Sequence, residues 1–167
     1  MNRCVMPTLT ALVSLSLGIT VAAATAMAQT ANDLVGTWMN VSVSLIRADG
    51  SKADAFGSNM KVLTVFESNG HFVTAVGRTD LPKFASGNRM TGTAEENKAV
   101  VQGSLAFFGT YTVANKIVTL KVEGGTWPGW IGADEQQTIV SFTGDELKFT
   151  QLASAGGTAE VTLKRLR

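Results

Sequence analysis

The sequence predicts an all-β fold: an eight-stranded antiparallel up-and-down barrel with one short helix between the third and fourth strands. Apolar and polar residues alternate with a period close to two in segment after segment, which is typical of half-buried strands. Most connections are short enough to make consecutive strands antiparallel neighbours. About eight strands in a meander leave two free edges, and closure into a barrel removes both. The competing arrangement is a two-sheet sandwich, which usually needs longer crossings between its sheets.

Residues 1–28 have the layout of a cleavable signal peptide. Arg3 provides a basic start, residues 8–24 are apolar and uncharged, and residues 26–28 (Ala-Met-Ala) fit a small-x-small cleavage site. The apolar run of roughly 15 residues is shorter than a membrane-spanning helix requires, although an uncleaved anchor is the alternative. We therefore expect cleavage after Ala28 and a barrel domain over residues 29–167. A periplasmic or secreted location without a transmembrane segment follows.

The alternating segments define the expected strands. They are residues 37–46, 60–66, 71–76, 105–113, 117–122, 136–142, 146–150 and 160–166. Asn69-Gly70 is the strongest hairpin signal, because both turn positions must tolerate positive φ. Asn115 and Gly144-Asp145 mark two further tight turns, and residues 155–157 (Ala-Gly-Gly) mark a third.

A single segment is expected to be helical. Thr93 and Glu96 form a capping box, in which each side chain accepts a hydrogen bond from the other residue's backbone N–H. Residues 97–102 tolerate a helix, and Gly103 occupies the expected C-terminal cap. Residues 78–92 contain Pro82 and several polar residues, which indicates a loop before the helix.

Composition excludes several classes of function. The 14 Lys and Arg residues are nearly balanced by 13 Asp and Glu residues, so no excess positive charge is available for nucleic acid. One Cys excludes an internal disulfide framework and a thiolate zinc site, and one His makes a metal centre or a catalytic triad a poor expectation. We expect no cofactor, no metal and no catalytic residue.

Inward-facing aromatic residues are candidates for either a packed core or a ligand cavity, because an eight-stranded barrel is filled or hollow by a small margin. Phe107 and Tyr111 share one face of their strand, and Phe66 and Phe72 lie across the Asn69-Gly70 hairpin. The candidate cavity residues are Phe66, Phe72, Phe107, Tyr111, His71, Arg78 and Trp130.

The polar and tryptophan candidates each carry two interpretations. His71 could act as a general acid or base, or only form local hydrogen bonds at a turn. Arg78 could attract a carboxylate at the cavity mouth, or simply be solvated. Trp127 and Trp130 could plug one barrel end, or form a hydrophobic rim that contacts a ligand or a protein.

Sequence motifs give a resemblance to a known family. Gly36-x-Trp38 at the head of the first strand resembles the lipocalin and calycin signature. The bacterial lipocalin-like domain family is similar over residues 34–166. The shared motifs, in order, are Asn69-Gly70-His71, Thr93 to Glu96, Gly103 to Tyr111, Pro128 to Gly132 and Gly144 to Leu147.

This resemblance implies a calycin-type barrel without fixing a function. It implies that Trp38 closes one barrel end and that Arg165, or Lys164, packs over it. Leu120, Thr138 and Phe107 stand where the family often carries polar side chains. These departures make the expected cavity more apolar and disfavour catalysis.

The sequence is compatible with three functions. The first is an exported protein that binds a small apolar molecule in the barrel. The second is a cyclase or isomerase, which requires at least two of His71, Tyr111 and Arg78 to converge on one cavity. The third is an envelope protein that binds a protein partner through the loop containing Trp127 and Trp130. We favour the first.

Overall fold

The computed structural model describes residues 29–54, 59–153 and 156–167. The signal peptide expected over residues 1–28 lies outside the described residues.

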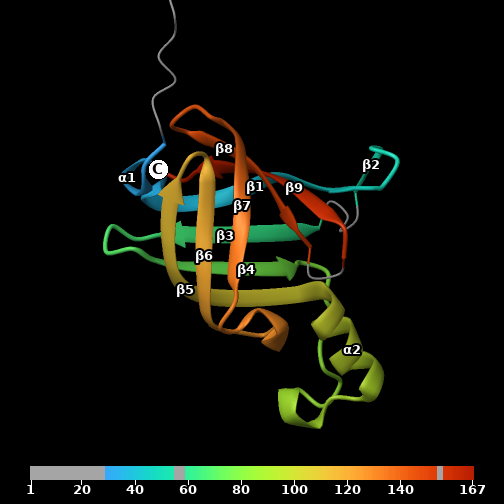
Figure 1. Ribbon diagram of the computed structural model, residues 1–167. Coiled ribbons are helices and arrows are strands. Elements are labelled where there is room, and N and C mark those ends of the chain that lie inside the picture. Colours follow the sequence, from blue (N-terminus) through green and yellow to red (C-terminus); the bar gives the residue numbers. More distant parts are fainter. Residues whose placement is uncertain (1–28, 55–58, 154–155) are drawn as a thin grey trace, which may run out of the picture.

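The described strands form a closed antiparallel barrel (Figure 1). Each strand of the ring pairs with its neighbours in chain order, and β1 also pairs with β9, which leaves the ring without a free edge. The ring strands are β1 (Gly36–Ile46), β3 (Met60–Phe66), β4 (His71–Arg78), β5 (Ser104–Ala114), β6 (Ile117–Gly125), β7 (Asp134–Phe142), β8 (Glu146–Leu152) and β9 (Thr158–Arg165). The predicted eight-stranded up-and-down barrel is therefore confirmed.

The predicted place of the helix in the strand order is wrong. The helix α2 (Ala94–Gly103) follows the fourth strand in chain order, β4, rather than the third. The additional strand β2 (Lys52–Ala53), which pairs with the end of β1, moves each later strand one place along in the order. A strand of two residues has no alternation from which it could be predicted. The remaining helices are short: α1 (Ala31–Leu34), η1 (Arg89–Thr91) and η2 (Pro128–Trp130).

Two tight turns differ in backbone conformation. At the Asn69-Gly70 turn, only Gly70 has a positive φ, of 85°. The turn between β5 and β6 instead holds both Asn115 and Lys116 at positive φ, 52° and 63°, as a two-residue hairpin of the primed type requires. The sequence thus locates both turns correctly, but the paired positive φ values occur at Asn115 rather than at Asn69.

The barrel strands bend at three irregularities. Register shifts occur in β1 between Asn40 and Ser42, in β6 between Val122 and Gly124, and in β7 between Ile139 and Ser141. Bulges of this kind increase strand bending and twist, which closure of a small barrel requires. Asn40 also extends the β1–β3 ladder through its side chain, whose Oδ1 accepts from the Val62 N–H at 2.9 Å.

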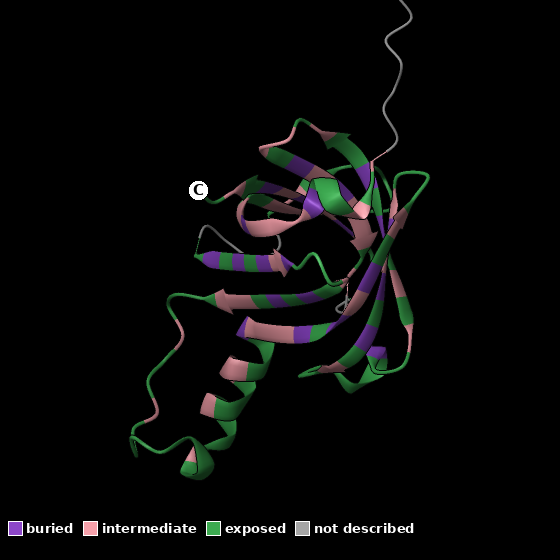
Figure 2. Cartoon of the chain, turned by 90° about the vertical axis from the view of Figure 1, so that its left-hand side faces the viewer, coloured by how far each residue is buried: buried purple, intermediate pink, exposed green. Residues whose placement is uncertain are grey.

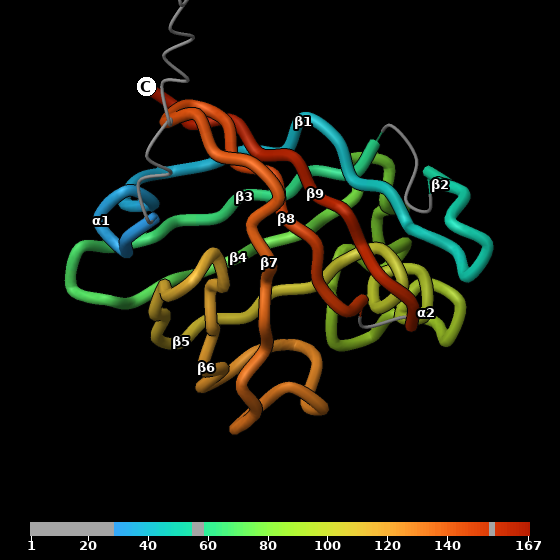
Figure 3. Tube along the Cα trace, turned by 45° about the horizontal axis from the view of Figure 1, so that its top comes forward, coloured from blue at the N-terminus to red at the C-terminus, as the bar shows by residue number. Residues whose placement is uncertain are grey.

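The helix α2 begins as predicted and projects from the barrel (Figure 2). Thr93 Oγ1 accepts from the Glu96 N–H at 3.2 Å, and Glu96 Oε2 accepts from the Thr93 N–H at 2.8 Å. Gly103 is the last helical residue rather than the cap, since the chain continues from Ser104 directly into β5. Figure 3 shows that α1 and α2 lie on opposite sides of the barrel.

Candidate functional site

The inside of the barrel is divided into a packed half and a hollow half. Among the described residues, buried apolar side chains that do not line the cavity described below fill the half next to α1. They are Leu34, Trp38, Phe66, Phe72, Tyr111, Val118, Leu120, Val122, Ile139, Leu147 and Leu163. The cavity described below lies in the other half.

The packed half ends in a seal made by Trp38 and Arg165. The indole Nε1 of Trp38 donates to the backbone oxygen of Leu34 at 2.8 Å. The Arg165 guanidinium carbon lies 4.2 Å from the centre of the Trp38 ring, a distance typical of a cation–π contact. Arg165 also donates to Val35 O, and to Gly144 O at 2.9 Å. Its basic side chain thus packs over the tryptophan and ties two distant segments together.

Gly36 makes room for this seal. Its φ is +134°, and a Cβ at this position would lie 2.7 Å from Nη1 of Arg165. Any larger residue would be strained in its backbone and would displace the guanidinium. The glycine and the tryptophan of the Gly-x-Trp sequence therefore serve the same contact.

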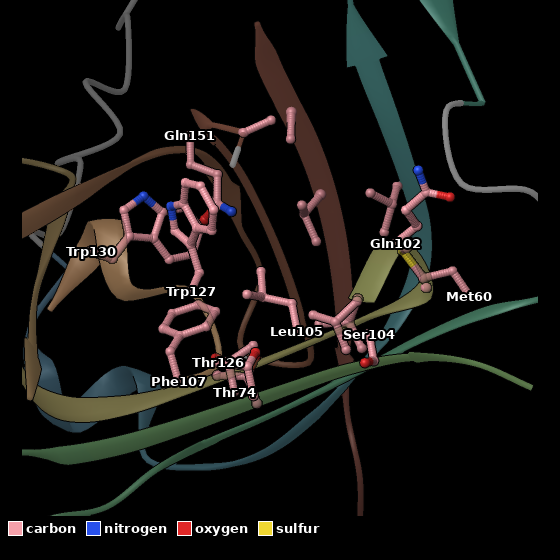
Figure 4. Close-up of a pocket in the computed structure, with 18 of the residues that line it drawn as sticks. Met60, Thr74, Gln102, Ser104, Leu105, Phe107, Thr126, Trp127, Trp130 and Gln151 are labelled. Carbon is pink, nitrogen blue, oxygen red and sulfur yellow. Dashed lines mark hydrogen bonds between the residues drawn. The ribbon is translucent and has the colours of Figure 1, made fainter. Parts of the chain in front are cut away.

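The hollow half contains a cavity of about 620 Å³ (Figure 4). This volume falls within the usual range for small-molecule sites. Its apolar wall comes from β1, β3, β4, β5, β8 and β9 and includes Val43, Met60, Val62, Val76, Leu105, Phe107, Phe149 and Val161. No charged side chain is found among the described residues that line it.

The mouth of the cavity lies between the end of α2 and the η2 loop. Val101 of α2 is 76% exposed and Trp127 is 45% exposed, and both line the cavity. Trp130 is buried and meets Phe107 edge to face, with ring centroids 5.0 Å apart. Of the two tryptophans, Trp130 is thus part of the wall and Trp127 is part of the rim.

Polar side chains interrupt the apolar wall: two pairs that hydrogen-bond within themselves, Thr64 with Thr74 and Gln137 with Gln151, and also Gln102, Ser104 and Thr126. The hydroxyls of Thr64 and Thr74 lie 3.0 Å apart and satisfy each other. Gln137 Nε2 donates to Gln151 Oε1 at 2.8 Å. The Oε1 atom of Gln137 is buried and has no hydrogen-bond partner among the described residues.

The structure brings two of the candidate cavity residues to the cavity. Phe107 and Trp130 line it, whereas Phe66, Phe72 and Tyr111 belong to the packed half. Tyr111 directs its hydroxyl to the backbone oxygens of Glu67, at 3.1 Å, and Ala31, at 3.2 Å. Burial raises the pKa of this hydroxyl.

The remaining two candidates lie outside the barrel interior. His71 is exposed, with Nδ1 3.1 Å from Oδ1 of Asn69. Arg78 is exposed and forms a two-point pair with Asp80, at 2.9 Å and 2.7 Å, which lowers the pKa of that carboxyl. His71, Tyr111 and Arg78 therefore do not converge on the cavity.

Sequence reasoning missed most of the wall, including Gln137 and Gln151. Gln137 is in phase with the buried Ile139 on the same strand, so a polar residue at an inward position was the available signal.

The described residues contain no cluster of His, Cys, Asp or Glu side chains that could hold a metal ion. Within the described ranges, no helix is both long enough and apolar enough to cross a membrane.

Comparisons with known proteins find a matching family model and solved structures of designed β-barrels. A family model described as a lipocalin-like domain matches residues 35–164. A redesigned β-barrel aligns at 18% identity over 84% of this chain and 98% of its own, with a TM-score of 0.44. A de novo designed fluorescence-activating β-barrel aligns at 11% identity over 81% of this chain and 96% of its own, with a TM-score of 0.40. The search of curated proteins finds no match.

Proposed function

Because this chain belongs to the family of lipocalin-like domains, we propose that it binds a small hydrophobic molecule in the hollow half of its barrel. The observation that carries the proposal is the cavity of about 620 Å³, with its apolar wall and its lack of charged side chains among the described lining residues. Side chains around an unfilled apolar space lose dispersion contacts, and an apolar ligand restores them. Such a ligand is also removed from water, which favours binding.

The proposal includes export from the cytoplasm. It rests on the basic start, the apolar stretch and the Ala-Met-Ala site within residues 1–28. A mature N-terminus at Gln29 in protein recovered from the periplasm or the medium would support it. Intact residues 1–28 on cytoplasmic protein would contradict it.

The enzyme alternative has less support. It needs at least two of His71, Tyr111 and Arg78 on one cavity, and their side chains lie at separate places on the barrel. The protein-binding alternative draws on the exposed ring of Trp127, but the same ring lines the cavity mouth, where a ligand also explains it. The binder therefore accounts for more of the geometry.

Binding can be tested with a neutral hydrocarbon that fluoresces in apolar surroundings, diphenylhexatriene. Ala159 lines the cavity, and a phenyl group at that position would occupy the space. Ala75 lies on the exposed face of β4, so Ala75→Phe is a matched control. We expect the wild type and the control to bind the probe, and Ala159→Phe to lose at least about tenfold in affinity, or about 1.4 kcal/mol. Equal affinity in all three proteins, or no binding by the wild type, would contradict the proposal.

Tryptophan fluorescence locates the bound probe. Trp127 and Trp130 line the cavity, whereas Trp38 lies in the packed half of the barrel. Bound probe should therefore quench the emission of the Trp38→Phe variant but leave that of the Trp127→Phe/Trp130→Phe double variant less affected. Native mass spectrometry of gently purified protein would then identify any molecule that it carries.

A further inference from the structure

The polar atoms in the cavity wall indicate the chemical class of the ligand, an inference that rests on the proposed function. We propose that the ligand is a neutral apolar molecule with one hydrogen-bond donor, a hydroxyl or an N–H, which pairs with Oε1 of Gln137. The site thus combines a hydrocarbon-binding wall with a single polar anchor on β7.

Of the two polar atoms in the Gln137 side-chain amide, one has a hydrogen-bond partner among the described residues and the other has none. Gln137 lines the cavity, and the residue is only 5% exposed. Nε2 is used by the hydrogen bond to Gln151, at 2.8 Å, while Oε1 is buried without a partner among the described residues. Buried carbonyl oxygens are nearly always hydrogen-bonded, because an unpaired one keeps its desolvation cost. A donor supplied by the ligand would remove that cost.

The other polar groups of the wall do not compete for this role to the same degree. Thr64 and Thr74 already hydrogen-bond to each other at 3.0 Å. Gln151 Oε1 already accepts from Gln137. Ser104 Oγ donates to the Val100 backbone oxygen at 2.7 Å, Thr126 Oγ1 accepts from the Ala106 N–H at 2.9 Å, and Gln102 is exposed. Gln137 Oε1 is therefore the buried acceptor of the described cavity wall that has no partner.

No charged side chain lines the described wall, and this disfavours a charged group on the part of the ligand inside the cavity. A carboxylate or an ammonium group inside the cavity would lose its hydration and meet no opposite charge among the lining residues. A neutral hydroxyl or N–H avoids this penalty. The ligand class is therefore an apolar alcohol or a neutral N–H compound rather than a fatty acid or an amine.

Three matched probes test this class by displacing diphenylhexatriene at pH 7.4. 1-Decanol and methyl nonyl ether are isomers, but only the alcohol donates a hydrogen bond, and decanoate carries a charge. The ether is the more hydrophobic isomer, so a wall without an acceptor would favour it. We expect 1-decanol to bind about fivefold or more tightly than the ether, and decanoate to bind more weakly than 1-decanol.

A pair of variants assigns the preference to one side chain. Gln137→Leu removes the unpaired acceptor, whereas Gln151→Leu removes its neighbour and leaves Oε1 of Gln137 in place. We expect the alcohol preference to vanish in the first variant and to persist in the second. If Gln137→Leu does not fold, the comparison of alcohol and ether in the wild type still decides the question.

The outcomes separate the two proposals. Diphenylhexatriene binding with no preference for the alcohol, or with decanoate as the tightest probe, overturns the ligand class and leaves the binding function intact. The same holds if Gln137→Leu folds and retains the full preference. A wild-type protein that does not bind diphenylhexatriene overturns both.

Discussion

Replacing Arg165 with Met should loosen the sealed end of the barrel while leaving the cavity intact. The guanidinium donates to the backbone oxygens of Asp33, Val35 and Gly144 and lies over the ring of Trp38. Methionine retains part of the apolar stem but has no donor and no charge. The substitution therefore removes a set of contacts that join the start of β1 to the β7–β8 turn.

The expected size of the effect follows from those contacts. The two part-buried hydrogen bonds each contribute about 1 kcal/mol, the exposed one contributes little, and the cation–π contact contributes about 1 kcal/mol. We expect Arg165→Met to lower the free energy of unfolding by about 3 kcal/mol, or the melting temperature by about 10 °C in a domain of this size. Arg165→Lys keeps a cation over Trp38 but cannot reach all three oxygens, so we expect a loss of about 2 kcal/mol.

Urea unfolding of the wild type and variants measures these differences. Arg167→Met is the matched control, because Asp145 is the partner of Arg167 within the described part of the chain and the Arg167 side chain is 81% exposed. We expect this control to stay within about 0.5 kcal/mol of the wild type. An Arg165→Met variant as stable as the control would refute the reasoning. Diphenylhexatriene affinity should be unchanged in every folded variant, since the seal lies at the other end from the cavity.

Three further predictions concern β5, β7 and α2. Gly109→Ala should cost about 2 kcal/mol or more in urea unfolding, because its Cβ would lie 2.0 Å from the backbone oxygen of Lys121, and an unchanged midpoint would contradict this. Burial raises the pKa of Glu135, so its contribution to stability is fully present at low pH and is lost as the pH rises through that pKa. Glu135→Gln should lack this loss, and identical unfolding profiles for the two proteins between about pH 4 and pH 8 would argue against it. Glu96 accepts from the Ala85 N–H at 2.7 Å, so Glu96→Ala should speed hydrogen exchange at Ala85, and an unchanged exchange rate would exclude this anchoring role.

The sequence predicted the direction of side chains better than their height in the barrel. Alternation correctly indicated that Phe66, Phe72, Phe107 and Tyr111 face inward. Height along the barrel axis depends on strand tilt and on the stagger between neighbouring strands, and alternation contains neither. Of these four residues, only Phe107 therefore reaches the cavity.

Local signals predicted the elements that depend on local contacts. The capping box at Thr93 and the turn at Asn115 each involve neighbours in the chain, so their residue types are informative. The pairing of Gln137 with Gln151 joins two strands and is visible only once their register is known. The bulge after Ile139 also breaks the alternation on β7, so that no single phase describes the strand.

The β1–β9 ladder has a consequence for the order of folding. It pairs Trp38 with Arg165, so the ring cannot close until β9, the last of its strands in chain order, is available. Before that moment, β1 and β8 each present an unpaired edge through which separate chains can associate. Hairpins such as β3–β4 can form early, since their contacts are local. The rate of folding should instead be set by the encounter of β1 with β9, which are far apart in the sequence, and this makes closure a late and cooperative event.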